Sequence, residues 1–168
     1  MPAKTDGTHD DIVFATMVPG DIGGKACFQH LPGVNLVQAA DVKGGLMLAN
    51  AKATPMIGKE TDRNGYIKIC LQWPCYDEPH VECIELGHGS SIMTLSLVYQ
   101  VAAITCEWFK ATRKARTRSN GTYKEWKVAS KETSDGVHEN HMVLRGLRHI
   151  GREYWVPILY WNPPDSRT

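Results

Sequence analysis

Apolar and polar residues alternate most regularly from Tyr66 to Trp73, where isoleucine, leucine and tryptophan occupy every second position after Tyr66. A period of two is typical of a strand with one buried face. The segment follows an Asn-Gly pair and stops at Pro74, which has no N–H to donate to a sheet. We therefore predict a strand over residues 66–73 and a loop over residues 75–89.

The apolar pattern then changes to one that repeats every three or four residues as far as Phe109. Its members form two adjacent stripes, which is typical of a helix covered on a wide face. Ser90 and Ser91 are both able to cap its first turn. We predict one long helix from Ser90 or Ser91 to Phe109.

Shorter patterns predict the remaining elements. Asn120-Gly121 is typical of a hairpin turn, and Pro157 marks the last strand as an edge strand or a broken one. The predicted strands are Ile12–Thr16, Val34–Gln38, Leu46–Ala49, the hairpin arms Ala115–Arg118 and Thr122–Ser130, Met142–Leu147 and Glu153–Trp161, with a polar loop over 131–141.

These elements predict an α+β fold, in which an antiparallel sheet packs against one long helix and an extended N-terminal arm precedes it. Residues 1–26 are polar and glycine-rich and form the predicted arm, and residues 27–168 form a single α+β domain. A chain of 168 residues buries enough surface for one core without a disulfide or metal staple.

Composition narrows the function classes. A net charge of +1 excludes a strongly basic nucleic-acid binder of the histone type. The chain has no run of 18 apolar residues, so we expect no membrane-spanning helix, and its acidic start does not resemble a secretory signal. Five cysteines, an odd number, favour a reduced cytosolic setting over secretion.

The near-zero net charge combines two segments of opposite sign. Residues 1–109 carry 7 Lys and Arg against 12 Asp and Glu, whereas residues 110–152 carry 11 against 4. If this split survives in the fold, an acidic half and a basic half pair head to tail between copies. It is one basis for expecting self-association.

Basic residues gather at the end of the predicted helix and on the predicted hairpin, interleaved with aromatic residues. A solvent-exposed hairpin explains such a run, and so does a docking surface for RNA phosphates or anionic lipid headgroups. The candidate nucleic-acid or membrane contacts are Lys110, Arg113, Lys114, Arg116, Arg118, Lys124 and Lys127, with Tyr123 and Trp126 as candidate aromatic contacts.

Cysteines and histidines in the predicted 75–89 loop are of the types that bind zinc, although the tight C-x2-C spacing is missing. The zinc candidates are Cys75, His80, Cys83 and His88, and scattered thiols in a loop are the expected alternative. Cys106 faces the core of the predicted helix, which disfavours a nucleophilic role. We therefore expect no catalytic residues, no metal and no cofactor.

The order of elements from residue 66 resembles that of rhabdovirus matrix proteins, and the small size is similar to that of the plant-infecting members. The matching pieces are the strand Tyr66–Trp73, the helix segment Val101–Ile104 with Trp108-Phe109, and the basic segment Thr122–Val128. The Lys-rich arm and the P-P-x-Y motif of such proteins are absent. The resemblance implies a virion protein of the host cytoplasm and inner membrane face that self-associates and condenses nucleocapsid.

The sequence therefore favours a non-enzymatic, matrix-like viral structural protein, with itself, ribonucleoprotein or RNA, and an anionic membrane surface as partners. Two alternatives remain open. One is an RNA-binding capsid-like protein or silencing suppressor that uses the basic-aromatic hairpin, and the other is a zinc-stabilised domain or enzyme.

Overall fold

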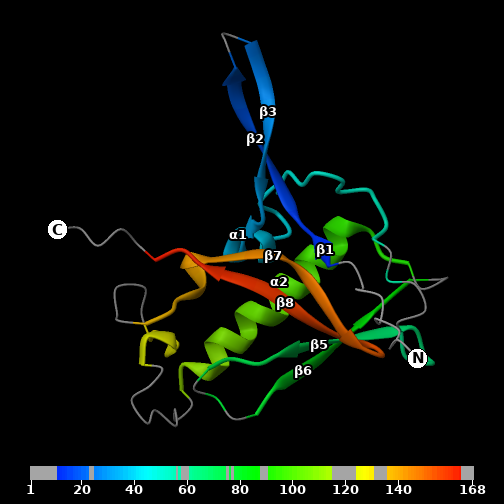
Figure 1. Ribbon diagram of the computed structural model, residues 1–168, viewed down its shortest axis with the longest axis vertical. Helices are drawn as coiled ribbons and strands as arrows, with labels where there is room; N and C mark the ends of the chain where they lie inside the picture. The colour runs from blue at the N-terminus through cyan, green and yellow to red at the C-terminus, as the bar shows by residue number, and fades with distance from the viewer. Residues whose placement is uncertain are drawn as a thin grey trace, which may run out of the picture.

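The computed structural model describes residues 11–22, 25–55, 57, 61–74, 76, 78–87, 91–114, 124–130 and 136–163. It has two sheets and two α-helices (Figure 1). The main sheet has the strand order β1-β7-β8-β5-β6, with β4 also paired to β7. An antiparallel sheet packed against one long helix confirms the predicted fold class, with one short parallel pairing between β5 and β8.

The strands and helices follow in chain order. The strands are β1 (Ile12–Val13), β2 (Ala15–Ile22), β3 (Lys25–Pro32), β4 (Val34–Asn35), β5 (Tyr66–Leu71), β6 (His80–Glu85), β7 (Met142–Gly151) and β8 (Tyr154–Trp161). The α-helices are α1 (Leu36–Ala40) and α2 (Thr94–Thr112), and the 3-10 turns are η1 (Lys124–Trp126) and η2 (Glu139–His141).

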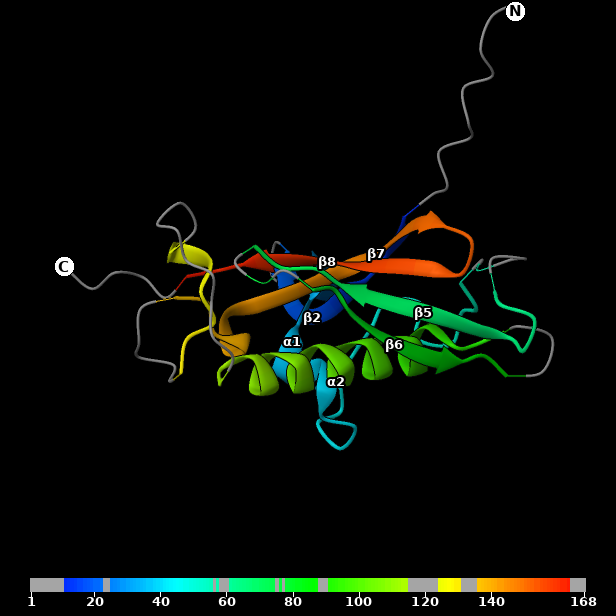
Figure 2. The same ribbon diagram turned by 90° about the horizontal axis from the view of Figure 1, so that it is seen from below.

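The core lies between α2 and one face of the main sheet. Figure 2 shows α1 and α2 on the same side of the sheet. The predicted alternation of β5 is confirmed, because Ile67, Ile69 and Leu71 are buried while the residues between them are half-buried. Leu97, Val101 and other α2 residues at spacings of three and four are fully buried against this face, as the helical pattern predicts.

The predicted strands at the C-terminal end are confirmed, and they form the middle of the sheet. β8 pairs with β7 along its whole length, but it pairs with β5 only at Tyr154 and Trp155. The Glu153 carbonyl accepts a hydrogen bond from the backbone N–H of Lys68 on β5. Because every second residue of a strand directs its backbone groups to the same edge, Trp155 and Pro157 also direct theirs toward β5. Pro157 has no N–H to offer β5, and the pairing stops before it.

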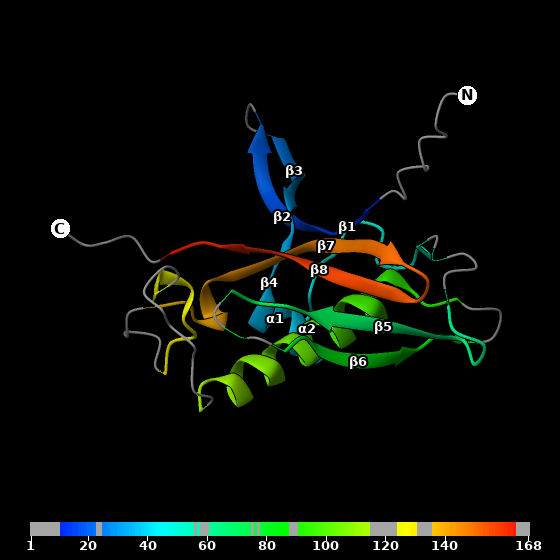
Figure 3. The same ribbon diagram turned by 60° about the horizontal axis from the view of Figure 1, so that its bottom comes forward.

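A β2–β3 hairpin stands away from the sheet at the end of β1 (Figures 1 and 3). The chain leaves the sheet at the buried Phe14 and returns at Gly33, whose N–H donates to the Phe14 carbonyl. From Ile12 onward, the segment predicted as an arm is a sheet strand followed by a hairpin. The predicted domain boundary after residue 26 falls inside β3.

Three short predictions in the first part of the chain differ from the structure. The predicted loop over 75–89 contains β6, whose edge position leaves only Ile84 buried, so no alternating pattern arises. The predicted strand Val34–Gln38 is shorter, because α1 begins at Leu36. The Asn35 side chain caps this helix by accepting hydrogen bonds from the N–H groups of Val37 and Gln38. The predicted strand Leu46–Ala49 contributes only a bridge from Leu48 to Thr16.

The long helix begins four residues after Ser90. Met93 occupies the N-cap position and makes no side-chain cap. The first two helical N–H groups, those of Thr94 and Leu95, donate instead to the Ala53 and Ala51 carbonyls. A neighbouring loop thus satisfies groups that a serine cap was expected to satisfy.

The predicted basic hairpin is wrong where the structure describes it. Residues 124–126 form η1 rather than a strand, and Val128 makes a single parallel bridge to Val137. The turn at Asn120-Gly121 and the first arm lie outside the described residues. None of the helices within the described ranges has the length and apolar character required to cross a membrane.

Gly146 on β7 is approached closely by the backbone of β1, the strand paired with it. A Cβ placed on Gly146 would lie far inside van der Waals contact with the Ile12 carbonyl oxygen. We expect Gly146→Ala to lower the free energy of unfolding by about 3 kcal/mol, measured by urea denaturation. Gly45→Ala, which adds backbone strain at φ +64° but meets no atom within 4 Å, is expected to cost only about 1 kcal/mol. Equal losses would contradict the close packing of β1 on β7.

Candidate interaction surfaces

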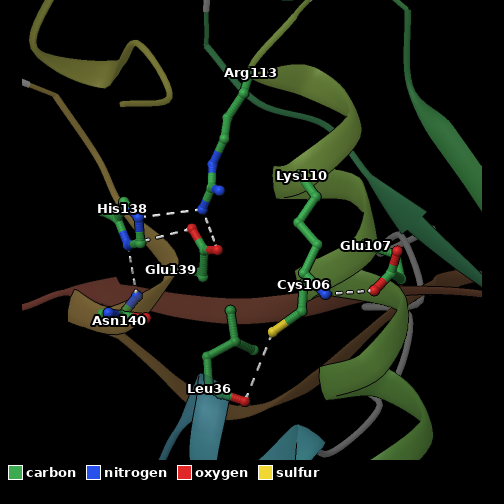
Figure 4. Close-up of polar contacts among 8 residues, drawn as sticks. All are labelled: Leu36, Cys106, Glu107, Lys110, Arg113, His138, Glu139 and Asn140. Atoms are coloured by element: carbon green, nitrogen blue, oxygen red, sulfur yellow. Dashed lines mark hydrogen bonds and ion pairs between the residues drawn. The ribbon is translucent and has the colours of Figure 1, made fainter. Parts of the chain in front are cut away.

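Arg113, one of the predicted polyanion contacts, turns inward at the end of α2. Its guanidinium donates to Glu139 Oε1 and lies 3.2 Å from His138 Nε2 (Figure 4). Glu139 is buried, so the pair ties α2 to η2 beneath β7. An arginine held by a buried carboxylate is a structural contact and is not exposed for phosphate binding.

The remaining basic candidates are distributed differently. Lys110 is paired with Glu107 at 2.7 Å on the exposed side of α2 (Figure 4). Lys114 and Lys127 are exposed. Arg116 and Arg118 lie outside the described residues, as does the side chain of Lys124. The structure therefore does not bring the predicted basic cluster together on one described surface.

Trp126, a predicted base-stacking residue, packs into an aromatic cluster. Its ring lies 5.8 Å from Trp73 and 6.0 Å from Trp161, and its carbonyl accepts the Trp73 indole N–H at 2.6 Å. Because the Trp126 ring already contacts the Trp73 and Trp161 rings, it is poorly placed to stack on bases. Tyr123, the other aromatic candidate, lies outside the described residues.

The zinc candidates that the structure describes do not converge. His80 and Cys83 are three residues apart on β6, so their side chains point to opposite faces of the strand. His80 lies 3.2 Å from Glu82, whereas Cys83 is opposite Lys68. Cys75 and His88 lie outside the described residues. Among the described residues, no three His, Cys, Asp or Glu side chains form a group suited to a metal ion.

Cys106, the cysteine that the sequence places in the core of the long helix, is buried on α2. Its Sγ lies 3.9 Å from the Leu36 carbonyl oxygen (Figure 4). Burial raises the pKa of this thiol to about 11, and the nearby Glu139 carboxylate adds to the effect. Cys106 is therefore a protonated core side chain at neutral pH.

Ion pairs place opposite charges side by side in the fold. Arg148 pairs with Asp11 at 2.9 Å, and Lys68 pairs with Glu153 at 2.8 Å. The hydrogen bonds in these pairs lower the pKa values of Asp11 and Glu153. The fold thus mixes the two signs at these places, and the opposite poles expected from the sequence are not preserved there.

A cleft of about 530 Å³ lies at the base of the β2–β3 hairpin. One side is formed by the hairpin, through Val18 and Leu31, and the other by α1 and the 41–47 segment, through Leu46 and Met47. We call it the hairpin cleft. Leu31 and Met47 are each 47% exposed, so the cleft presents apolar side chains to solvent.

The two outer edges of the hairpin are interrupted by prolines. The Met17 N–H donates to the Met47 carbonyl and the Ala49 N–H donates to the Ala15 carbonyl, so alternate β2 residues direct their backbone groups outward. Pro19 is the next outward position on β2, and Pro32 is opposite Ala15 on β3. Prolines at such positions limit strand-to-strand addition of another chain.

Sequence reasoning missed the hairpin and its cleft. The pairing Ala15↔Pro32 through Ile22↔Lys25 is centred on Gly23-Gly24, a two-residue turn signal that was visible in the sequence. Two prolines within the strands obscured it.

Comparison with known proteins gave no match to any family model, any curated protein or any solved structure.

Arg113 and Lys114 make a matched pair for testing the inward arginine. We expect Arg113→Ala to lower the free energy of unfolding by about 2 kcal/mol, because it leaves the buried Glu139 without its guanidinium. Lys114→Ala, at the exposed neighbouring position, is expected to change it by less than about 0.5 kcal/mol. Both values come from urea denaturation, and equal effects would contradict the structural role of Arg113.

Cys83 and Cys106 are expected to differ in reactivity. Cys83 is exposed, and Cys106 is buried with a raised pKa. Iodoacetamide at pH 8 should therefore label Cys83 in the folded protein and label Cys106 only after denaturation. Peptide mass spectrometry measures both sites, and rapid labelling of Cys106 in the folded chain would contradict its buried placement.

Proposed function

We propose that this protein is a non-enzymatic structural protein that self-associates, and that the β2–β3 hairpin of one copy docks in the hairpin cleft of another. The observation that carries the proposal is a hairpin that leaves its own core at Phe14 and makes few contacts with other helices or strands. A two-stranded hairpin alone is marginally stable in water. Docking on a second copy supplies the packing that its own subunit does not.

Exposed side chains on the hairpin support docking through the face of the hairpin rather than through its edges. Phe28 lies opposite Pro19 on the hairpin, is 56% exposed, and does not line its own hairpin cleft. A projecting aromatic ring of this kind is a typical interface anchor. The volume of the cleft is in the range that receives a few side chains.

The cleft also stands among exposed apolar residues. Val37 on α1 and Val42 in the following loop are 39% and 70% exposed, and each is adjacent in sequence to a residue that lines the cleft, Gln38 and Asp41. Apolar residues gathered in this way mark interaction sites more often than scattered ones do. They give the docked hairpin an apolar surface to cover.

A matrix-like role fits this proposal. A protein whose copies link into a layer is suited to lie between ribonucleoprotein and an anionic membrane, as the resemblance to rhabdovirus matrix proteins implies. The buried, protonated Cys106 supports the non-enzymatic part of the proposal.

Phe28→Ser tests the proposal directly. We expect it to weaken self-association by about tenfold or more, because it removes the anchor from the cleft of the next copy. Sedimentation velocity over a range of concentrations measures the effect. Met93→Ser is the control, because Met93 is 55% exposed at the start of α2 and is not part of the hairpin or the cleft.

Two results would count against the proposal. A full chain that stays monomeric at all concentrations would rule out self-association. Equal weakening by Phe28→Ser and Met93→Ser would show that the hairpin has no special part in it.

A further inference from the structure

Strand β8 is apolar on both faces, although the helices among the described residues cover only one of them. Trp155 and Pro157 point to the core and are buried. Val156 and Ile158 point to the other side, where they are half-buried, and Tyr160 is 52% exposed. Strands apolar on both sides are typical of sheets that are covered on both faces. Both α1 and α2 nevertheless lie on one side of the sheet (Figure 2), and Trp155 belongs to the same core cluster as Leu97 and Val101 of α2.

The register of the sheet places more apolar side chains beside Val156 and Ile158. Val13, which is 71% exposed, is opposite Gly146, and Gly146 is opposite Ile158. Val81, which is 41% exposed, is opposite Cys70 on the outer side of β5. Residues opposite each other in a sheet share a face. We call this surface the open sheet face, and it contains Val13, Val81, Tyr154, Val156, Ile158 and Tyr160.

Three described cations around the open sheet face have partners. Lys68 is bonded to Glu153 and lies 5.0 Å from the centre of the Tyr154 ring. Arg148 is bonded to Asp11. Arg145 lies 4.6 Å from the centre of the Tyr160 ring.

The pairing of Lys68 and Arg148 with carboxylates indicates which class of partner the open sheet face fits. RNA and anionic lipid surfaces are bound chiefly by cations that exchange small counterions for phosphates. An apolar centre with a satisfied polar rim is instead the usual anatomy of a contact between proteins. Because Lys68 and Arg148 are each paired with a carboxylate, neither brings an unpaired charge to the same face of a second copy, and Arg145 contacts the Tyr160 ring.

We propose that the open sheet face is the contact between two copies of this chain in a twofold dimer. Two sheets pack face to face with their strands at about 30°, and a twofold axis brings the same residues of both copies together. Val156 and Ile158, which occupy the middle of the face, lie next to this axis.

This dimer contact rests on the proposed self-association and adds a second site to it. One twofold contact closes a pair of copies and stops there. A copy with two different contacts, the open sheet face and the hairpin cleft, joins further copies into chains or layers. The two contacts are separable by mutation, because the face and the cleft use different residues.

Sedimentation equilibrium on four proteins tests the dimer: the full chain, Phe28→Ser, Ile158→Glu and the double variant. We expect Phe28→Ser alone to remain dimeric through the open sheet face. Ile158→Glu should raise the Kd of that dimer by about 100-fold or more, because it places an unpaired carboxylate in the apolar centre. The double variant should be monomeric, and Met93→Glu is the matched control.

A cross-linking variant keeps the test decisive if Ile158→Glu fails to fold, as judged by circular dichroism. Ile158→Cys should form a disulfide between copies under mild oxidation, because a residue beside a twofold axis meets its own counterpart. Met93→Cys and the unchanged chain are the controls, and equal cross-linking in all three would overturn the inference.

The other outcomes are equally distinct. If Phe28→Ser alone is monomeric, the dimer contact is overturned while the hairpin proposal stands. If the double variant stays dimeric, the open sheet face is not the contact. If Ile158→Glu self-associates normally but no longer sediments with phosphatidylserine vesicles, the face is a membrane surface and the inference is overturned. A full chain that is monomeric overturns both proposals.

Discussion

A single layer of helices covers the main sheet, and this one-sided packing determines the rest of the structure. Leu97 and Val101 on α2 bury the side of the sheet that carries Ile69 and Trp155. Apolar burial on that side is the principal source of stability. The sheet also contains β8, whose other side is apolar, and neither described α-helix covers that second face.

Local backbone rules shape both proposed contact surfaces. Gly146 lets the backbone of β1 approach β7 closely, and Gly33, at φ +85°, lets the chain return to the sheet after the hairpin. Together they separate the hairpin from the core. Pro157 ends the pairing of β8 with β5, so the two strands diverge and leave a small pocket of about 170 Å³. Each surface thus depends on one or two residues that set the path of the backbone.

Strands and helices with a regular apolar pattern were predicted well, and those with a weak pattern were not. The strand at residues 66–73 and the long helix were predicted because one face of each is buried along nearly its whole length. β6 was missed, because an edge strand with only Ile84 buried has no alternating pattern. The 3-10 turn at residues 124–126 was predicted as a strand, because the packing of Trp126 against Trp73 depends on tertiary structure.

The interaction surfaces were harder to predict than the fold. The basic residues appeared as one cluster in sequence, but Arg113 pairs with Glu139, which comes 26 residues later. Only the three-dimensional structure shows which cations are neutralised internally. The run Tyr154–Trp161 did contain a usable signal, since eight consecutive apolar residues are unusual for a strand with one face in water.

The physical basis of the proposed self-association therefore differs from the one the sequence suggested. Attraction between charged poles weakens as salt screens it, and the ion pairs Arg148–Asp11 and Lys68–Glu153 reduce such poles within each copy. Contacts through Phe28 and Ile158 depend on apolar area, which salt does not screen. Charges paired within each copy and apolar side chains left outside favour association by shape and burial, and this is why we propose another copy of the same chain as the partner of both surfaces.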